Sequence, residues 1–429
     1  MEEKNSEAEN SDDEDGKSKV SMSSTKSSRI ERAPVKMFQV QPAFQSGSTP
    51  VHLEHRFMLW NHVGQVLSHA GDENSIIVEF HDVTDHPSLH IANVLNHEMA
   101  SLSNTCLALG TKETPCRIVC IALSASGSKE WTTTMPGVEE IQCIATSSSF
   151  VAVATDAGFI RFFTIMGTQR EVIVVPGKIV TMAGNDNKLA VVYNNSSTSN
   201  KYSLMIINMV GLTMTSRTVD VPLTINSKIT WLGFSDMGSI IAYDSYGKMI
   251  CYNIKRSLWY PICDMTEHVV GASDSFFIIS VSEREQKIQA ALCRGTSYPI
   301  LVNPRPIARE LDFALPLCNM ESEKSKLEDS LIRSANFAMD SANTTLVEKG
   351  LKLFSTAMNS ELESRAYEII ELIRDKRLIE LAARYATQKG RLHIASKISK
   401  MLTEFEEKVC LLIEESIAIL IITLIIPGT

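Results

Sequence analysis

Short hydrophobic runs separated by polar turns fill residues 40–310 of this chain. The runs are rich in Val, Ile, Phe, Tyr and Thr, and clusters of Gly, Asp, Asn or Ser interrupt them, as is typical of β-strands and their turns. The clearest examples are Phe150–Phe163 and Ser239–Tyr252, where two apolar arms flank a tight turn. The pattern therefore predicts a long series of β-hairpins.

These hairpins recur at a nearly constant spacing. Their turns are centred near residues 72, 112, 157, 196, 245 and 284, about 42 residues apart on average. A unit of that length with four short strands is typical of a propeller blade. We therefore predict a six-bladed β-propeller over residues 37–316. A stacked β-sandwich pair is the alternative, because the Gly-His and Trp-Asp signatures of many blades are missing.

The pattern changes at Pro316, where apolar residues begin to recur at helical spacing. No proline follows until Pro427, and only Gly350 and Gly390 interrupt the run before it. We predict five helices near 321–340, 343–358, 361–374, 376–389 and 391–407. Connections this short favour antiparallel neighbours, so residues 317–408 are predicted to form a small helical bundle.

The two ends of the chain differ from these domains. Eight acidic residues and one lysine lie among the first fifteen residues, and a Ser/Lys stretch follows, so residues 1–36 are predicted to be a disordered linker. Residues 409–429 form an atypical apolar tail, in which the uninterrupted run Ser416–Ile426 is short of the about 20 residues that a spanning helix needs. A membrane partner is therefore not expected. A buried last helix or an atypical chain end remain as interpretations of the tail.

Charge and cysteine content narrow the class of function. The chain has 429 residues and a net charge of −9, which argues against a surface that coats nucleic acid. Nine cysteines show no framework spacing, and no apolar signal opens the chain. Both features indicate a reducing compartment, the cytosol or the nucleus.

Residues that could carry chemistry are few. The phosphate-binding, zinc-binding and nucleophile-elbow motifs GxGxxG, GxxxxGK[ST], HExxH and GxSxG are missing. Eight of the ten histidines lie between His52 and His97, but their spacing does not resemble a ligand set. Cys116 and Cys120 are interpreted as core thiols, and turn acids such as Asp244 as turn formers. We therefore predict no catalytic residue, no cofactor and no metal site.

The helical part offers a binding function instead. Five short helices rarely bury every apolar position, and a groove between two of them can accept an amphipathic partner helix. The apolar stripes on the predicted helices 343–358 and 376–389 are expected to consist mostly of core residues, because they recur at helical spacing. Binding to other proteins is thus favoured over catalysis.

Over residues 37–405 the chain resembles the chromosome transmission fidelity/WD40-and-HMG-box DNA-binding protein family, in its SepB-type propeller and the helical domain behind it. The stretches that carry the resemblance are Ser48–Asn61, Val78–Asp82, Ser128–Trp131, Thr181–Gly184, Trp231–Ser235, Trp259–Cys263, Leu315–Cys318, Glu323–Lys324, Arg333–Ser334 and Leu381–Ala386. None is a catalytic motif, and the resemblance depends on their number and order.

The resemblance implies a nuclear, homotrimeric and non-enzymatic scaffold at the replication fork, associated with chromatin indirectly. Such a scaffold would couple the replicative helicase to DNA polymerase alpha–primase and other clients. In fungal members, helical client peptides dock between the second and fourth helices of the helical domain. The corresponding candidates in this chain are Leu351, Phe354, Met358, Leu378, Ala382 and Tyr385.

The chain departs from the family pattern at both ends. The N-terminal WD40 propeller and the C-terminal HMG box of animal members are missing, so direct DNA binding is not expected.

Two other functions are compatible with a propeller followed by helices. One is an enzyme that uses the central channel, which requires convergent acids and histidines. The other is a subunit of a coat or transport assembly, which normally continues into a long helical solenoid.

Overall fold

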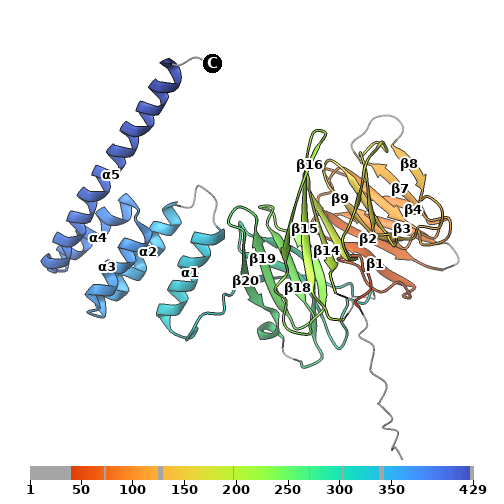
Figure 1. The fold of residues 1–429 in the computed structure, drawn as a ribbon. Helices are drawn as coiled ribbons and strands as arrows, with labels where there is room; N and C mark the ends of the chain where they lie inside the picture. Colours follow the sequence, from red (N-terminus) through yellow and green to blue (C-terminus); the bar gives the residue numbers. More distant parts are fainter. Residues whose placement is uncertain are drawn as a thin grey trace, which may run out of the picture. The chain divides into compact units, whose positions relative to one another are not determined.

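The computed structural model describes residues 40–71, 74–123, 129–196, 198–269, 271–301, 304–337 and 343–425, and Figure 1 shows their strands and helices in chain order. The linker predicted over residues 1–36 and the last residues of the tail, 426–429, lie outside the described residues.

The described strands form six antiparallel sheets, each made of strands that are consecutive in the chain. The first three sheets contain β1 (His55–Trp60), β2 (Gly64–His69), β3 (Ser75–Phe80) and β4 (Leu89–Ala92); β5 (Met99–Leu102), β6 (Cys106–Gly110), β7 (Arg117–Ala122) and β8 (Glu130–Thr134); and β9 (Ile141–Thr146), β10 (Val151–Thr155), β11 (Phe159–Phe163) and β12 (Gln169–Val174). The other three contain β13 (Lys178–Asn185), β14 (Lys188–Asn194), β15 (Tyr202–Val210) and β16 (Thr213–Asp220); β17 (Ile229–Phe234), β18 (Ile240–Asp244), β19 (Lys248–Asn253) and β20 (Leu258–Asp264); and β21 (Ser275–Ser282), β22 (Lys287–Cys293) and β23 (Ala308–Asp312). We call these sheets blades 1 to 6.

Apolar side chains fill the space between each blade and the next. Cys143 and Ala152 of blade 3, for example, share one buried cluster with Leu189 and Val191 of blade 4. The last cluster joins Phe57 and Trp60 of blade 1 to residues of blade 6 such as Phe277 and Ile279, which closes the ring. The prediction of a six-bladed propeller is confirmed, and the sandwich alternative is wrong.

The sixth blade differs from the expected four strands. Its described residues form three strands, and the turn near residue 284 joins β21 to β22, the first and second strands of the blade. The other five predicted turns join second and third strands. The regular spacing therefore combined two kinds of turn, because in blade 6 the second and third strands are joined by the longer connection 294–307 and the short turn lies one position earlier.

Residues 41–49 precede the first strand and contact the innermost strands of several blades. Phe44 N donates to Val180 O of β13 at 2.9 Å, and Trp60 N of β1 donates to Gly47 O at 2.8 Å. This segment, which we call the strap, is not a strand of any blade.

Five helices follow the propeller, as predicted: α1 (Glu323–Phe337), α2 (Asn343–Asn359), α3 (Glu363–Ile373), α4 (Lys376–Gln388) and α5 (Leu392–Ile425). Asp375 caps α4 by accepting from Leu378 N at 3.1 Å, and Gly390, with a φ of 73°, lies in the turn that follows α4. The first four helices match their predicted bounds within a few residues. The fifth was predicted to end near residue 407, but its backbone remains helical to Ile425 and takes in most of the unassigned tail.

Helix α1 joins the helical domain to the propeller. Its Phe337 packs edge-on against Phe313 and Tyr260, with ring centroids 5.5 and 6.0 Å away. Arg333 binds Asp329 one turn earlier and donates from Nη1 to Gln286 Oε1, each at 2.8 Å. One side of α1 therefore belongs to the interface between blades 5 and 6.

Arg56 is a buried cation that braces the start of blade 1. Its guanidinium donates to Thr49 O at 3.1 Å and to Glu98 O, so it links the strap to the segment before β5. Burial lowers the pKa of Arg56, and the nearby Glu98 carboxylate partly opposes this effect. Its hydrogen-bond acceptors are backbone carbonyls, and the positive charge makes both hydrogen bonds stronger.

Replacing Arg56 with Leu should lower the free energy of unfolding by about 2–4 kcal/mol, because two carbonyls lose their buried donor. Arg284→Leu is the matched control, since Arg284 is exposed, and it should change stability by less than about 0.5 kcal/mol. Urea denaturation followed by fluorescence measures both variants. Equal effects would show that Arg56 does not brace the ring.

Candidate partner-binding site

Helices α2 and α4 pack against each other, and aromatic and polar contacts fix their relative position. The rings of Phe354 on α2 and Tyr385 on α4 meet edge to face, with centroids 6.1 Å apart. Tyr385 also donates from its hydroxyl to Asn359 Oδ1 at 3.3 Å. A side chain at Gly350 would come within 2.6 Å of Ile373 and 3.0 Å of Leu378, so glycine allows this close approach.

Most of the six candidate residues lie in the core of the helical domain. Phe354, Met358, Leu378 and Ala382 are at most 5% exposed, while Leu351 and Tyr385 are half-buried. The first four form the packing between the helices, so they cannot themselves be a contact surface unless the helices separate. Only Leu351 and Tyr385 are accessible from outside.

A different set of residues is exposed on α4. Arg377, Leu381, Arg384 and Gln388 follow one another on the exposed side of α4, at spacings of four, three and four residues. Leu381 is 39% exposed between the two arginines, for which we find no ion pair in the described part of the chain. We call Leu351, Leu381, Tyr385, Arg377 and Arg384 the α2–α4 face. Sequence analysis selected Leu351 and Tyr385 but not Arg377, Leu381 and Arg384, because these three lie outside the apolar stripe. The leucine between two arginines was the available signal.

The electrostatics of this face favour an acidic partner. Lys352 on α2 is exposed as well, and Lys389 lies over the Tyr385 ring at 5.6 Å. Two acidic side chains lie on the same helices: Glu348 is exposed on α2, and Glu380 is half-buried on α4 beside Leu381. An apolar side chain surrounded by cations suits an amphipathic segment that carries both apolar and acidic residues.

A second concave surface lies at one mouth of the propeller channel. It has a volume of about 730 Å³, and its walls are the turns between the first and second strands of the blades. The tip of the strap, Gln45–Gly47, also lines it. Several of its charged groups make structural bonds: Asp236 of blade 5 accepts from Ser282 Oγ and Glu283 N of blade 6, and Lys287 pairs with Glu310 within blade 6 at 2.5 Å. These contacts hold the blades and their strands together.

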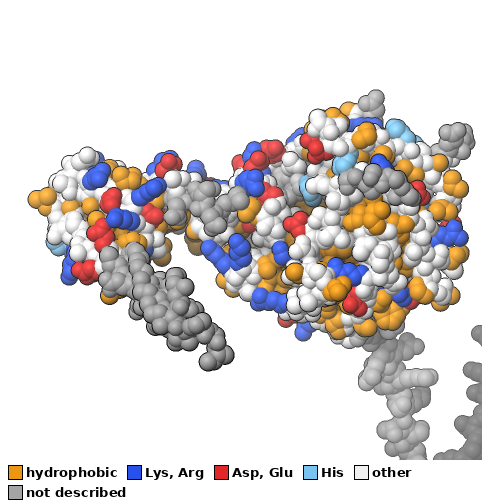
Figure 2. All heavy atoms as spheres, turned by 90° about the horizontal axis from the view of Figure 1, so that it is seen from above, with side chains coloured by type: hydrophobic (Ala, Val, Ile, Leu, Met, Phe, Trp, Pro, Cys, Tyr) orange, Lys and Arg blue, Asp and Glu red, His pale blue; other side chains and the backbone are white. Residues whose placement is uncertain are grey.

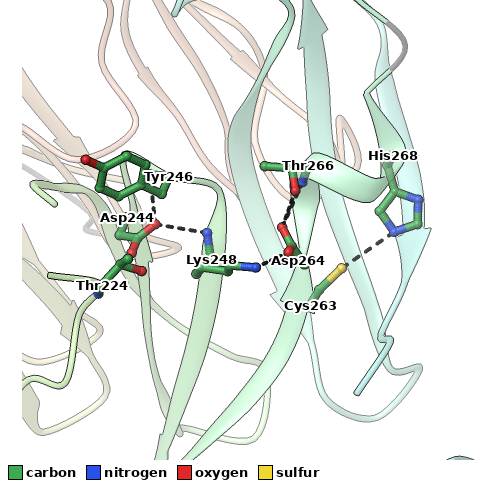
Figure 3. Close-up of polar contacts among 8 residues, drawn as sticks. All are labelled: Thr224, Asp244, Tyr246, Lys248, Cys263, Asp264, Thr266 and His268. Atoms are coloured by element: carbon green, nitrogen blue, oxygen red, sulfur yellow. Dashed lines mark hydrogen bonds and ion pairs between the residues drawn. The ribbon is translucent and has the colours of Figure 1, made fainter. Parts of the chain in front are cut away.

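The turn acids also make structural bonds (Figure 3). Buried Asp244 accepts from the backbone N–H groups of Tyr246 and Lys248, both at 2.9 Å, and from Thr224 N at 3.2 Å. Asp264 binds Lys248 and Thr266; burial opposes ionisation, but these partners outweigh it and lower the pKa of Asp264. The interpretation of Asp244 as a turn former is supported by its partners.

Most of the described cysteines are buried, and two histidines pair across neighbouring strands. Cys116 and Cys120 are buried, as predicted, and burial raises the pKa of Cys263, which lies 3.6 Å from His268, to about 11 (Figure 3). His55 pairs across strands with His69, their Nδ1 atoms 3.1 Å apart. Within the described ranges, we find no group of three or more side chains placed to hold a metal ion.

The surface is mixed in charge. Figure 2 shows Lys, Arg, Asp and Glu dispersed over the visible face, with hydrophobic patches between them and no single basic stripe. Among the residues that the structure describes, no helix is long and apolar enough to cross a membrane.

Both domains match models and relatives of one protein family. Residues 42–317 match the family model "Minichromosome loss protein, Mcl1, middle region", and residues 318–408 match "DNA polymerase alpha-binding protein Ctf4, C-terminal domain". WD repeat and HMG-box DNA-binding protein 1 is 34% identical in Xenopus laevis and 32% in Homo sapiens, each over 85% of this chain. Minichromosome loss protein 1 of Schizosaccharomyces pombe is 25% identical over 83% of it.

The chain spans about a third of the length of the two vertebrate relatives, 34% in each case, and 48% of the yeast relative. Among solved structures, the crystal structure of HIRA(644-1017) aligns with a TM-score of 0.40 and 14% identity, covering 71% of this chain and 94% of that one.

His97 should make the stability of the propeller depend on pH. Its side chain is buried, its Nδ1 has no hydrogen-bond partner among the described residues, and burial lowers its pKa from 6.5 to about 4. Since the unfolded chain binds this proton more tightly, stability should fall as the pH drops from 6.5 towards 4. Urea midpoints measured across this range should show a smaller decrease for His97→Gln than for the parent. Exposed His90→Gln should behave like the parent, and identical curves for all three would contradict the assignment.

Proposed function

Because the chain belongs to the family of the minichromosome loss protein Mcl1 and the DNA polymerase alpha-binding protein Ctf4, we propose that it is a non-enzymatic adaptor of DNA replication. In this proposal it couples the replicative helicase to DNA polymerase alpha–primase and other clients. It acts in the nucleus, and its association with chromatin passes through these partners.

The observation that carries the proposal is the position of the α2–α4 face. The face lies within residues 318–408, the part that matches a domain whose description names DNA polymerase alpha binding. It combines an exposed leucine and a half-buried tyrosine with exposed arginines. A client segment that is helical, apolar on one side and acidic on the other would complement it.

Helix α1 supports this role by holding the binding helices on the ring. Lys349 of α2 donates to Ser334 Oγ at 2.6 Å and to Ser330 O at 3.2 Å, both on α1. Leu331 of α1 is buried in the same core as Phe354 and Leu378. The opposite side of α1 packs on blades 5 and 6, so one helix serves both domains.

Self-association completes the proposal. A homotrimer assembled through the propellers would present three α2–α4 faces to clients at one fork. A single contact of micromolar strength corresponds to about −8 kcal/mol. Linked clients on a trimer gain avidity on the order of 10² or more, so weak individual contacts suffice.

The α2–α4 face can be tested by capture from nuclear extract. The double variant Leu381→Glu/Arg384→Glu should retain at most about a tenth of the DNA polymerase alpha that the parent retains. The first substitution removes the apolar contact of the face, and the second inverts a charge on it. Lys397→Glu is the matched control, since Lys397 is exposed on α5. Immunoblotting quantifies the retained polymerase. Equal retention by parent and double variant would exclude the face as the polymerase contact.

The trimer has its own test. Light scattering coupled to size exclusion at micromolar concentration should give three times the monomer mass of 47.5 kDa. Circular dichroism of the same fractions checks that the protein is folded. A folded monomer would remove the avidity argument, although a single weak contact would still be measurable.

A further inference from the structure

The strap binds the channel through side chains that imitate a peptide bond. Gln41 donates from Nε2 to Ile229 O at 2.7 Å and accepts from Ile229 N at 3.2 Å through Oε1. Gln45 pairs with Ile144 in the same manner, at 2.7 and 3.0 Å. Each primary amide thus satisfies both backbone groups of one residue on an innermost strand, β17 or β9.

The next strap residues extend this recognition. Ser46 donates from Oγ to Leu232 O at 2.7 Å and accepts from Leu232 N at 2.9 Å. At Gly47 the backbone has a φ of 72°, and an added Cβ would lie 3.0 Å from Trp60 O. A small residue with left-handed backbone is therefore required where the strap turns from blade 5 towards blade 1.

The contacts connect blades that are far apart in the ring. The strap bonds to β17, β13 and β9 on blades 5, 4 and 3, and then to Phe57 and Trp60 on blade 1. The seam between blades 6 and 1, by comparison, relies on the small apolar cluster around Trp60 and Phe277 and on the Arg305–Glu79 ion pair at 2.8 Å. Among the described strands, none passes from one of these two blades into the other.

We propose that the channel of the propeller is a peptide-binding site, whose resident ligand is the chain's own residues 41–49. The site selects an extended, uncharged segment with glutamine at two positions four residues apart, followed by Ser-Gly. The bound segment adds hydrogen bonds between blade 1 and blades 3, 4 and 5 to a ring whose first and last blades share no described strand. The inference is independent of the proposed role in replication.

The first test uses the full-length chain with a protease site inserted after His52, next to Val51, which is 50% exposed. After native cleavage, the fragment ending at residue 52 should remain bound through size exclusion. A labelled peptide of residues 39–52 in excess should then exchange into the cleaved protein. The same peptide with Gln41→Ala and Gln45→Ala should bind at least about tenfold more weakly, because both amide pairs are lost. Release of the fragment under native conditions overturns the proposal.

The second test needs no cleavage and no truncated chain. In full-length Gln45→Ala, hydrogen exchange at the Ile144 amide should accelerate about fivefold or more, since its acceptor is removed. The Ile229 amide, which is bonded to Gln41, should keep its rate in that variant and accelerate in Gln41→Ala. Unchanged exchange at Ile144 in Gln45→Ala would show that the strap does not bind as described.

Discussion

Closure of the ring is the constraint on which the rest of the structure depends. Each blade is apolar on both faces, so it is stable only while both neighbours cover it. Five of the six seams lie between blades that follow each other along the chain, and the sixth must join the two ends of the propeller. The strap bridges blade 1 to blades 3, 4 and 5 with hydrogen bonds, and Arg56 ties the strap to the backbone before β5. The backbone N–H and C=O groups of Ile144, Ile229 and Leu232, which face the channel, thereby gain hydrogen-bond partners.

A rigid ring gives the helical domain a defined support. Helix α1 has residues in two cores, Phe337 between blades 5 and 6 and Leu331 among the other helices. The polar pair Arg333–Asp329 strengthens the join, because Asp329 also accepts from Leu315 N at 3.2 Å. In the proposed adaptor, this connection would fix the client site relative to the propeller, through which we propose that the chain self-associates.

Much of this architecture could be predicted from the sequence, for identifiable physical reasons. Hydrophobic alternation and helical periodicity report burial directly, so the six blades and five helices were predictable. The strap was not, because Gln41, Gln45 and Ser46 act through hydrogen bonds to distant strands and leave no periodic signal. The candidate site was predicted on the helices observed as α2 and α4, but periodicity selects buried residues such as Phe354 and Ala382. The accessible residues, Leu381 and Arg384, depart from the stripe and require the structure.

Cross-linking mass spectrometry of the chain in complex with DNA polymerase alpha tests the central claim most directly. If the α2–α4 face receives the polymerase, intermolecular cross-links should concentrate on Lys352 and Lys389, which border that face. The exposed lysines of the propeller, such as Lys178 and Lys228, serve as internal controls. Cross-links confined to the propeller lysines would contradict the account, because the helical domain would then not be the part that holds the client.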